Sequence, residues 1–497
     1  MKRNNLTTAI VAGIVGVAGI ASVSNAVNLN PDGLGQVLVY PYYTVNNDLN
    51  TLISVVNTTD EVKAVKVRFL EGKNSRECLD FNLFLSPYDV WTAGLIPTAA
   101  TSLYSPGHEG EPTVKLLTAD KSCSDPSANV LSGYEFLPWA FDVSSGYDGI
   151  GRSLERCTEG HFEMIEMGVV SDATTATGIT HVGGIPANCG VISSLYANRD
   201  TYMSAPTGGL FGSASIVDVA GGTDITYNAD AINDALRSQT LTNASDLQPS
   251  LATLQVNTSN VFHNGAVQTD TWLNSSVQAI SAIYMHNNIY GEYELFDDIT
   301  AHTEWVVTFP TKNFYVDAAR TPFGSVPYEP FTAPLTENGA CEIYGIQIWD
   351  REERVPEDGL IIEPPSPTPP GQTGENPLFC WETNVVEFED TDRTSGDSII
   401  LGSRNTTHLV AKRVAAQAAT PTTPAVDAQY FVNGWVALSF SEAGQQTADN
   451  LTNTNYVGLP VTGFAVQSYV NANAQPGILA AYAGIFKHRY SRSITSL

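Results

Sequence analysis

Positively charged residues are scarce in this 497-residue chain. Lys and Arg together number 24 against 52 Asp and Glu, which gives a formal net charge of −28, and charged residues make up only 15%. Binding to nucleic-acid phosphates or to anionic membranes requires clustered Lys and Arg side chains, and the sequence has no such cluster. We therefore expect no nucleic acid as a partner, whereas cations and neutral ligands such as glycans remain open.

Motifs of common catalytic and metal sites are also missing. The sequence contains no H-E-x-x-H zinc motif, no G-x-S-x-G nucleophile elbow and no C-x-x-C pair, and its eight His residues are dispersed. The glycine-rich segment 208–213 does not follow the G-x-x-x-x-G-K-[ST] pattern of a phosphate-binding loop. No motif therefore assigns a catalytic residue or a cofactor-binding residue.

A long apolar run occurs only once, within residues 1–26. Lys2 and Arg3 precede an uncharged stretch over residues 9–23, and Ser24-Asn25-Ala26 then supplies a small-x-small cleavage site. The stretch is shorter than the roughly 20 residues that a membrane-spanning helix needs. This layout is typical of a secretory signal peptide, so we expect cleavage after Ala26 and a mature chain without a transmembrane segment. Removal of Lys2 and Arg3 would change the net charge from −28 to −30.

Six cysteines are present, at Cys78, Cys123, Cys157, Cys189, Cys341 and Cys380. In an oxidising compartment this even number, at no zinc-site spacing, indicates three disulfides. Cys341 and Cys380 bracket a proline-rich segment and should pair with each other. The other four pair either sequentially, as 78–123 and 157–189, or in overlap, as 78–157 and 123–189. We favour the overlapped form, because Cys78 begins one expected strand and Cys157 precedes another.

Alternating apolar and polar residues predict a mainly β chain. Val65, Val67 and Phe69 alternate with Lys66 and Arg68, which predicts a half-buried strand with one basic face. Similar runs occur at 79–85, 304–309 and 435–440, separated by turns rich in Gly, Pro, Asn and Asp. We therefore expect one or more immunoglobulin-like antiparallel β-sandwiches with long loops and a few short helices.

The expected organisation has four parts. Residues 1–26 form the signal peptide and residues 27–225 an N-terminal β-rich region. Residues 226–275 form a connector with short helices, at 229–236 after the cap Asn228 and at 250–254 after Pro249. Residues 276–497 form a C-terminal β-rich region that contains the proline-rich loop 362–377.

One acidic segment suggests a calcium site. Glu389, Asp390, Asp392 and Asp397 bring four carboxylates into a turn-like stretch beside Gly396. Calcium binds several oxygen ligands from a flexible loop, and carboxylates two residues apart in a loop can converge on one ion. The late glycine and Arg393 inside the segment depart from a regular calcium loop and also fit a solvated acidic turn.

Two further groups could bind or cleave carbohydrate. Glu163 and Glu166 are the nearest pair of acids with apolar neighbours, as a glycosidase requires. The flanking glycines favour a strand, in which an offset of three residues places the two acids on opposite faces, and a solvated strand edge is the alternative. The aromatic segment 40–43 could stack on sugars or pack at the edge of a sandwich.

Several segments resemble known proteins. Val55–Asp60 with Val65–Leu70, and Gly434–Leu438 with Val461–Ala465, resemble strands of immunoglobulin-like domains in exported bacterial proteins. Most of the chain is similar to a family of exported proteobacterial proteins without assigned function, through the segments Asn28–Gln36, Tyr40–Tyr43, Ser86–Trp91 and Phe309–Lys312. The resemblance implies a location in the periplasm, on the outer cell surface or outside a Gram-negative cell.

Taken together, these features predict an exported, acidic, non-enzymatic β-sandwich protein with a surface, structural or adhesion role. Its expected partners are other surface proteins, a second copy of itself or glycans. Two alternatives stay open at this point: a secreted carbohydrate-acting hydrolase with acids from distant strands, and a periplasmic small-ligand-binding module.

Export provides the first test. Because Ser24-Asn25-Ala26 ends the apolar stretch, we expect the secreted protein to begin at Val27. Intact-mass measurement of the protein recovered from the cell envelope or the medium checks this start. A mass that includes residues 1–26 on exported protein would contradict the prediction.

Overall fold

The described part of the chain is mainly antiparallel β-sheet with a few short helices, as the sequence predicts. The computed structural model describes residues 26–496 except 144–145, 297–298, 357–359, 364–376, 392–394, 415–424, 426–428, 442–445 and 448–449. All but the last residue of the predicted signal peptide, most of the proline-rich loop and Asp392 therefore lie outside the described residues. Among the described residues, no helix has the length and apolar character required to cross a lipid bilayer.

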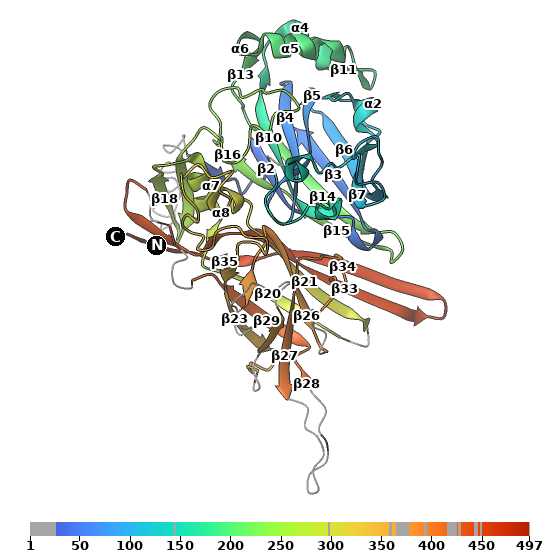
Figure 1. The fold of residues 1–497 in the computed structure, drawn as a ribbon, viewed down its shortest axis with the longest axis vertical. Helices are drawn as coiled ribbons and strands as arrows, with labels where there is room; N and C mark the ends of the chain where they lie inside the picture. The colour runs from blue at the N-terminus through green and yellow to red at the C-terminus, as the bar shows by residue number, and fades with distance from the viewer. Residues whose placement is uncertain are drawn as a thin grey trace, which may run out of the picture.

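The N-terminal part is a sandwich of two sheets, drawn mostly in blue and green in Figure 1. We call it the first sandwich. Its eight-stranded sheet has the path β1 (Asn28–Leu29), β16 (Asp230–Asn233), β2 (Val37–Thr44), β10 (Glu159–Val170), β4 (Lys63–Glu71), β5 (Glu77–Leu85) and β8 (Cys123–Asp125), with β13 (Met203–Ser204) beside β10. Its six-stranded sheet has the order β15 (Thr223–Asn228), β14 (Leu210–Asp218), β3 (Asn50–Asn57), β6 (Val90–Ala99), β7 (Pro112–Leu117) and β9 (Tyr134–Glu135).

Aromatic side chains fill the space between these two sheets. Tyr40 stacks on Phe162 with ring centroids 4.1 Å apart, and Tyr43 meets Phe69 edge to face. Tyr40, Tyr42 and Tyr43 are all fully buried. Segment 40–43 therefore contributes to the protein interior and offers no exposed ring for stacking on a sugar.

The C-terminal part contains two more sheets. The seven-stranded sheet has the path β24 (Leu360–Glu363), β27 (Thr406–Val414), β26 (Thr383–Glu389), β21 (Ala301–Thr308), β33 (Thr462–Gln475) and β34 (Ile478–Lys487), with β28 (Gln429–Tyr430) beside β27. The β26–β27 pair is parallel. The four-stranded sheet has the order β23 (Gly345–Asp350), β29 (Asn433–Ser439), β20 (Asn288–Glu294) and β35 (Arg489–Ser491).

The seven-stranded sheet is covered on both faces. One face packs on the core of the first sandwich through Val306, Val385, Phe464 and Val466. The other face belongs to a second core, shared with the four-stranded sheet, through Trp305, Val307, Val386, Phe388 and Ala465. This sheet therefore forms a middle layer between the first sandwich and the four-stranded sheet.

Helices are short and cover the ends and the back of the sheets. Helices α4 (Ala173–Ile179), α5 (Ile192–Ala197) and α6 (Arg199–Tyr202) lie over one end of the first sandwich (Figure 1). Helix α7 (Ser276–Tyr284) begins with a capping box between Ser275 and Gln278 and is buried from Val277 onward. It shares a core with Val37 and Ile165, on the outer face of the eight-stranded sheet.

Short elements complete the described chain. They are η1 (Asn46–Asp48), α2 (Ala128–Leu131), α3 (Trp139–Asp142), η2 (Leu154–Thr158), β11 (His181–Val182), β12 (Ile185–Pro186), η3 (Cys189–Val191), β17 (Thr258–His263), β18 (Ala266–Thr271), β19 (Met285–His286), α8 (Asn313–Val316), β22 (Glu342–Ile343), β25 (Leu378–Phe379), β30 (Gln446–Thr447), β31 (Thr454–Val457), β32 (Leu459–Pro460) and β36 (Ser493–Ser496).

Three local predictions are wrong. Residues 229–236 contain strand β16 in place of a helix, because residues 230–232 pair with β2 and extend the eight-stranded sheet. Residues 250–254 form a turn. The expected basic face of β4 is not exposed, since Lys66 and Arg68 are buried on the outer side of that sheet. In each case contacts distant in sequence override the local pattern.

The disulfides follow the favoured pairing. Cys78 bonds to Cys157, Cys123 to Cys189, and Cys341 to Cys380, and no cysteine of the chain is free. The first bond joins the start of β5 to η2. The second joins β8 to η3 below the helices α4–α6. The overlapped prediction is therefore confirmed.

The 78–157 bond should contribute strongly to stability. It closes a loop of 79 residues, which corresponds to about 4 kcal/mol in the chain-entropy model. We expect the variant Cys78→Ser/Cys157→Ser to lose about that free energy of unfolding, measured by urea denaturation without reductant. Peptide mapping of the parent protein under non-reducing conditions provides the control. Unchanged stability, or a peptide linking Cys78 to Cys123, would contradict the assignment.

Candidate functional site

The structure describes three of the four predicted calcium residues. Glu389 is the last residue of β26 and is buried, and Asp390 follows it directly. Asp397 is 52% exposed, and its carboxylate lies 3.9 Å from Nε of Arg404. Asp392 lies outside the described residues, so a calcium site over these four residues stays a prediction.

Glu389 belongs to a different group, formed with Glu387 and His408. Side chains two residues apart on a strand share a face, so β26 presents Glu387 and Glu389 together. The parallel register of β26 and β27 pairs Glu387 with His408. Nδ1 of His408 lies 3.0 Å from a carboxylate oxygen of Glu387 and 3.4 Å from one of Glu389. We call these three residues the Glu–Glu–His cluster; one ligand atom from each lies within 4.8 Å of the others.

A third carboxylate lies beside the cluster. Glu304 on β21 pairs in register with Glu387, so Glu304, Glu387 and His408 form a row across three neighbouring strands. Burial, and then the charge of Glu387, raise the pKa of Glu304 to about 8. Burial alone would lower the pKa of His408, but contacts with Glu387 and Glu389 outweigh it and raise the pKa to about 9. Without another cation, an imidazolium therefore balances the buried carboxylates.

Segment 396–401 covers this row. Nε2 of His408 lies 3.2 Å from the carbonyl of Gly396. The backbone N–H of Ile399 donates to Glu387 at 2.9 Å, and the hydroxyl of Ser398 donates to Glu304 at 2.9 Å. The same segment reaches the first sandwich, where Thr44 on β2 donates to the carbonyl of Leu401 at 3.1 Å. The row is thus tied directly to the contact between the two β-units.

The donors of the Glu–Glu–His cluster suit a divalent cation with mixed nitrogen and oxygen ligands. Of these three residues, only Glu389 was predicted as a metal ligand from the sequence. The Glu387-Phe388-Glu389 alternation was a signal for two acids on one strand face. The approach of His408 had no local signal, because it depends on the parallel pairing of β26 with β27.

In the acid pair expected for a glycosidase, each carboxylate forms an ion pair with its own cationic side chain. Glu163 and Glu166 lie on one strand, β10, and have different partners: Glu163 pairs with Arg68, and Glu166 accepts from Nζ of Lys63 at 2.8 Å. Both are buried, so the expected solvated strand edge is wrong. With each carboxylate held by its own cation, the pair does not form the facing carboxyls of a glycoside hydrolase.

Ser86, Asp89 and His181 form a second small polar cluster. The hydroxyl of Ser86 lies 2.7 Å from Nδ1 of His181, and a carboxylate oxygen of Asp89 lies 3.5 Å from the same nitrogen. In a Ser-His-Asp triad the serine and the aspartate contact different ring nitrogens, so that the ring can transfer a proton. Here they share one nitrogen, and the geometry does not support that transfer.

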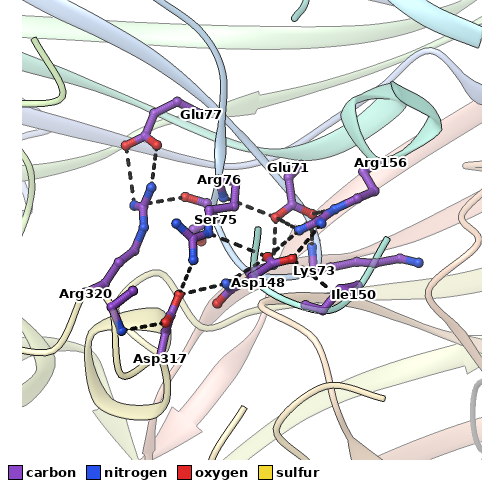
Figure 2. A network of polar contacts seen from close by, with 12 residues as sticks. Glu71, Lys73, Ser75, Arg76, Glu77, Asp148, Ile150, Arg156, Asp317 and Arg320 are labelled. Atoms are coloured by element: carbon purple, nitrogen blue, oxygen red, sulfur yellow. Dashed lines mark hydrogen bonds and ion pairs between the residues drawn. The ribbon is translucent and has the colours of Figure 1, made fainter. Parts of the chain in front are cut away.

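A network of buried charges joins the first sandwich to the C-terminal part (Figure 2). Arg156 donates to Glu71 at 2.9 Å and to both carboxylate oxygens of Asp148, at 2.9 and 2.8 Å. Arg76 donates to Asp317 at 2.6 Å, which links the β4–β5 turn to the residue after α8. We call this group the junction network.

Glu77 occupies one side of the junction network. It pairs with Arg68 on the neighbouring strand β4 and with Arg320 from the C-terminal part. Burial would raise the pKa of Glu77, but the charges of Arg320 and Arg68 outweigh burial and lower it to about 2. These two charges therefore keep Glu77 ionised even though its side chain is buried.

No protein-family model, curated protein or solved structure matches the chain at a significant level. The resemblance to exported proteobacterial proteins and the immunoglobulin-like assignment therefore stay predictions. The functional conclusions below depend on the residues and their geometry.

The junction network makes stability sensitive to acid. Because the pKa of Glu77 falls from 4.5 to about 2 on folding, ionised Glu77 stabilises the fold above pH ~4.5, and this contribution disappears as pH falls towards 2. At about 1.4 kcal/mol per pKa unit, the contribution is about 3 kcal/mol. We expect Glu77→Gln to unfold more easily at pH 7 and to lose this part of the acid dependence, measured by urea titrations from pH 7 to 2. Parallel pH profiles of parent and variant would contradict it.

Proposed function

We propose that the protein is an exported, non-enzymatic structural protein of the Gram-negative cell envelope or surface, and that it assembles with a second copy of itself through the hairpin β33–β34. The signal-peptide pattern, the three disulfides and the resemblance to exported proteobacterial proteins support export. The observation that carries the assembly role is the exposed edge of this hairpin.

Strand β34 ends the seven-stranded sheet. It pairs along one side with β33, and in the described residues no strand pairs with its other side. Figure 1 shows the hairpin, in red, projecting beyond the body of the molecule. One face of β34 packs towards β15 through Ala483 and Ile485. The other face carries exposed apolar side chains, and the outer edge has no paired strand among the described residues.

The open face is apolar and uncharged. Ile478, Tyr482 and Phe486 on this face are each about half exposed, at 51%, 59% and 56%. From Thr462 to Phe486 the sequence contains no charged residue. Monomeric proteins usually protect an edge strand with charges, prolines or bulges, and β34 has no charge before Lys487 and no proline. This edge is therefore suited to pairing with another strand.

Charge favours a second copy as the occupant. Two mature chains, each with a net charge of −30 after loss of Lys2 and Arg3, repel over most of their surfaces, and the uncharged hairpin is a place where they can approach. An antiparallel pair of two β34 edges is self-complementary, as a twofold dimer requires. The exposed rings would pack across the pair, and the free N–H and C=O groups of both edges would find partners.

The hydrolase alternative has less support. A hollow of about 440 Å³ lies on the outer face of the six-stranded sheet, and no residue that lines it has a carboxylate, imidazole or thiol. Leu52, Thr92 and Ser215 are among the residues that line it. A glycosidase needs two facing carboxyls in such a hollow.

Oligomeric state tests the proposal. We expect the mature parent protein to sediment as a dimer, and Tyr482→Lys/Phe486→Lys to sediment as a monomer, because two cations would face their own copies across the pair. Sedimentation velocity over a hundredfold range of concentration measures this. Phe262→Lys, at another exposed ring on β17, is the matched control and should remain dimeric. A monomeric parent over the whole range, or a dimer that survives the double substitution with unchanged affinity, would overturn the proposal.

A further inference from the structure

We propose that Glu387, Glu389 and His408 bind a divalent transition-metal ion of the Zn²⁺ class. This site is separate from the β34 edge and does not depend on the assembly proposed above. It joins β26 and β27, two neighbouring strands of the middle sheet, and lies on the face that the first sandwich covers.

The distances within the Glu–Glu–His cluster fit such an ion. Zinc binds imidazole nitrogen and carboxylate oxygen at about 2.0–2.2 Å, so two ligand atoms of a tetrahedral site lie roughly 3.3–3.5 Å apart. Nδ1 of His408 lies 3.0 Å and 3.4 Å from the carboxylate oxygens of Glu387 and Glu389. Small side-chain rotations would therefore place all three donors around one ion.

The orientation of His408 is an independent observation. Its Nε2 faces the carbonyl of Gly396 at 3.2 Å, which fixes the N–H on that side of the ring. In the neutral ring this leaves the lone pair of Nδ1 directed at the two carboxylates. Nδ1 makes no hydrogen bond of acceptable angle, and the side chain is only 3% exposed. A metal-bound histidine typically has this arrangement, with one ring nitrogen on the ion and the other donating to a carbonyl or carboxylate.

The carboxylates are also held from outside the cluster. The N–H of Ile399 donates to one oxygen of Glu387, and the other oxygen faces His408. Such contacts fix a ligand before the ion arrives and lower the cost of ordering it. Glu304 on the adjacent strand places a further carboxyl group next to Glu387.

The donor set favours a transition metal over calcium. Calcium takes six to eight oxygen ligands, and imidazole is not among its usual donors. An imidazole with two carboxylates is a set that zinc and its neighbours in the first transition row accept readily. Three protein ligands leave a fourth position for water or for a further side chain.

Binding would also strengthen the contact between the two β-units. Segment 396–401 contacts His408, Glu387 and Glu304 on one side. On its other side, Leu401 and Ser398 accept from Thr44 and Asn47 of the first sandwich. An ion held between β26 and β27 would stabilise this segment and slow its cleavage by proteases.

The experiment adds Zn²⁺, or Co²⁺ as a coloured substitute, to metal-free mature protein. We expect one ion per chain by elemental analysis after gel filtration, a raised Tm, and a Co²⁺ visible spectrum with imidazole coordination. His408→Asn and Glu389→Gln should each lose the bound ion. His263→Asn, at a histidine outside the cluster, and Asp397→Asn, in the acidic segment, are matched controls and should keep it.

Several outcomes would overturn the assignment. They are a parent protein that retains no stoichiometric Zn²⁺ or Co²⁺, an ion that survives His408→Asn, and an ion lost in His263→Asn. Binding of Ca²⁺ alone, lost in Asp397→Asn, would favour the acidic loop instead.

Circular dichroism of each variant separates loss of the ligand from loss of the fold, and the parent measurement decides the question even if a variant does not fold. The oligomeric state is read in the same gel filtration, so failure here is distinguishable from failure of the assembly proposal.

Discussion

The rest of the structure depends on charge pairing in the junction network, where two β-units meet through buried charged side chains. Arg156, Arg76 and Arg320 each meet a carboxylate contributed by a different segment of the chain. Removing one partner from such a pair leaves a buried charge uncompensated, which costs far more than the complete pair contributes. The planar guanidinium also requires its carboxylates at defined angles. The network therefore specifies how the first sandwich sits on the C-terminal part more than it adds to overall stability.

The middle sheet shows why this specification is needed. Apolar contacts alone would allow the layers to slide past one another. Both faces of the seven-stranded sheet are apolar over much of their area. Glu77 and Asp317 fix the position at one side of the junction. The Glu–Glu–His cluster and segment 396–401 fix it at another. Polar contacts at two separate places leave a single arrangement of the layers.

Much of the fold class could be predicted from the sequence, because strand alternation and turn residues are local. The cysteine pairing was also predictable, since Cys78 and Cys157 stand next to expected strands and their bond is present. The strand at 230–233 was not, because its hydrogen-bond partners on β2 are almost 200 residues away. The burial of Lys66 and Arg68 was missed for the same reason: segments that cover a strand's polar face leave no trace in its own alternation. Only part of the candidate metal site could be predicted, because Glu387 and Glu389 lie two residues apart in the sequence whereas His408 is distant from both.

For the export proposed above, the overlapped disulfides would have a consequence for the order in which bonds form. A chain that crosses a membrane from its N-terminus presents Cys78 and Cys123 before Cys157 and Cys189. An oxidant that acts on thiols as they emerge joins consecutive cysteines, whereas each of these two native bonds passes over one intervening cysteine. Conversion of the early bond then requires attack by a later thiolate on a disulfide that already exists. The native connectivity thus makes maturation depend on a disulfide-exchange catalyst in the receiving compartment, or on a delay in oxidation until the fourth cysteine has arrived.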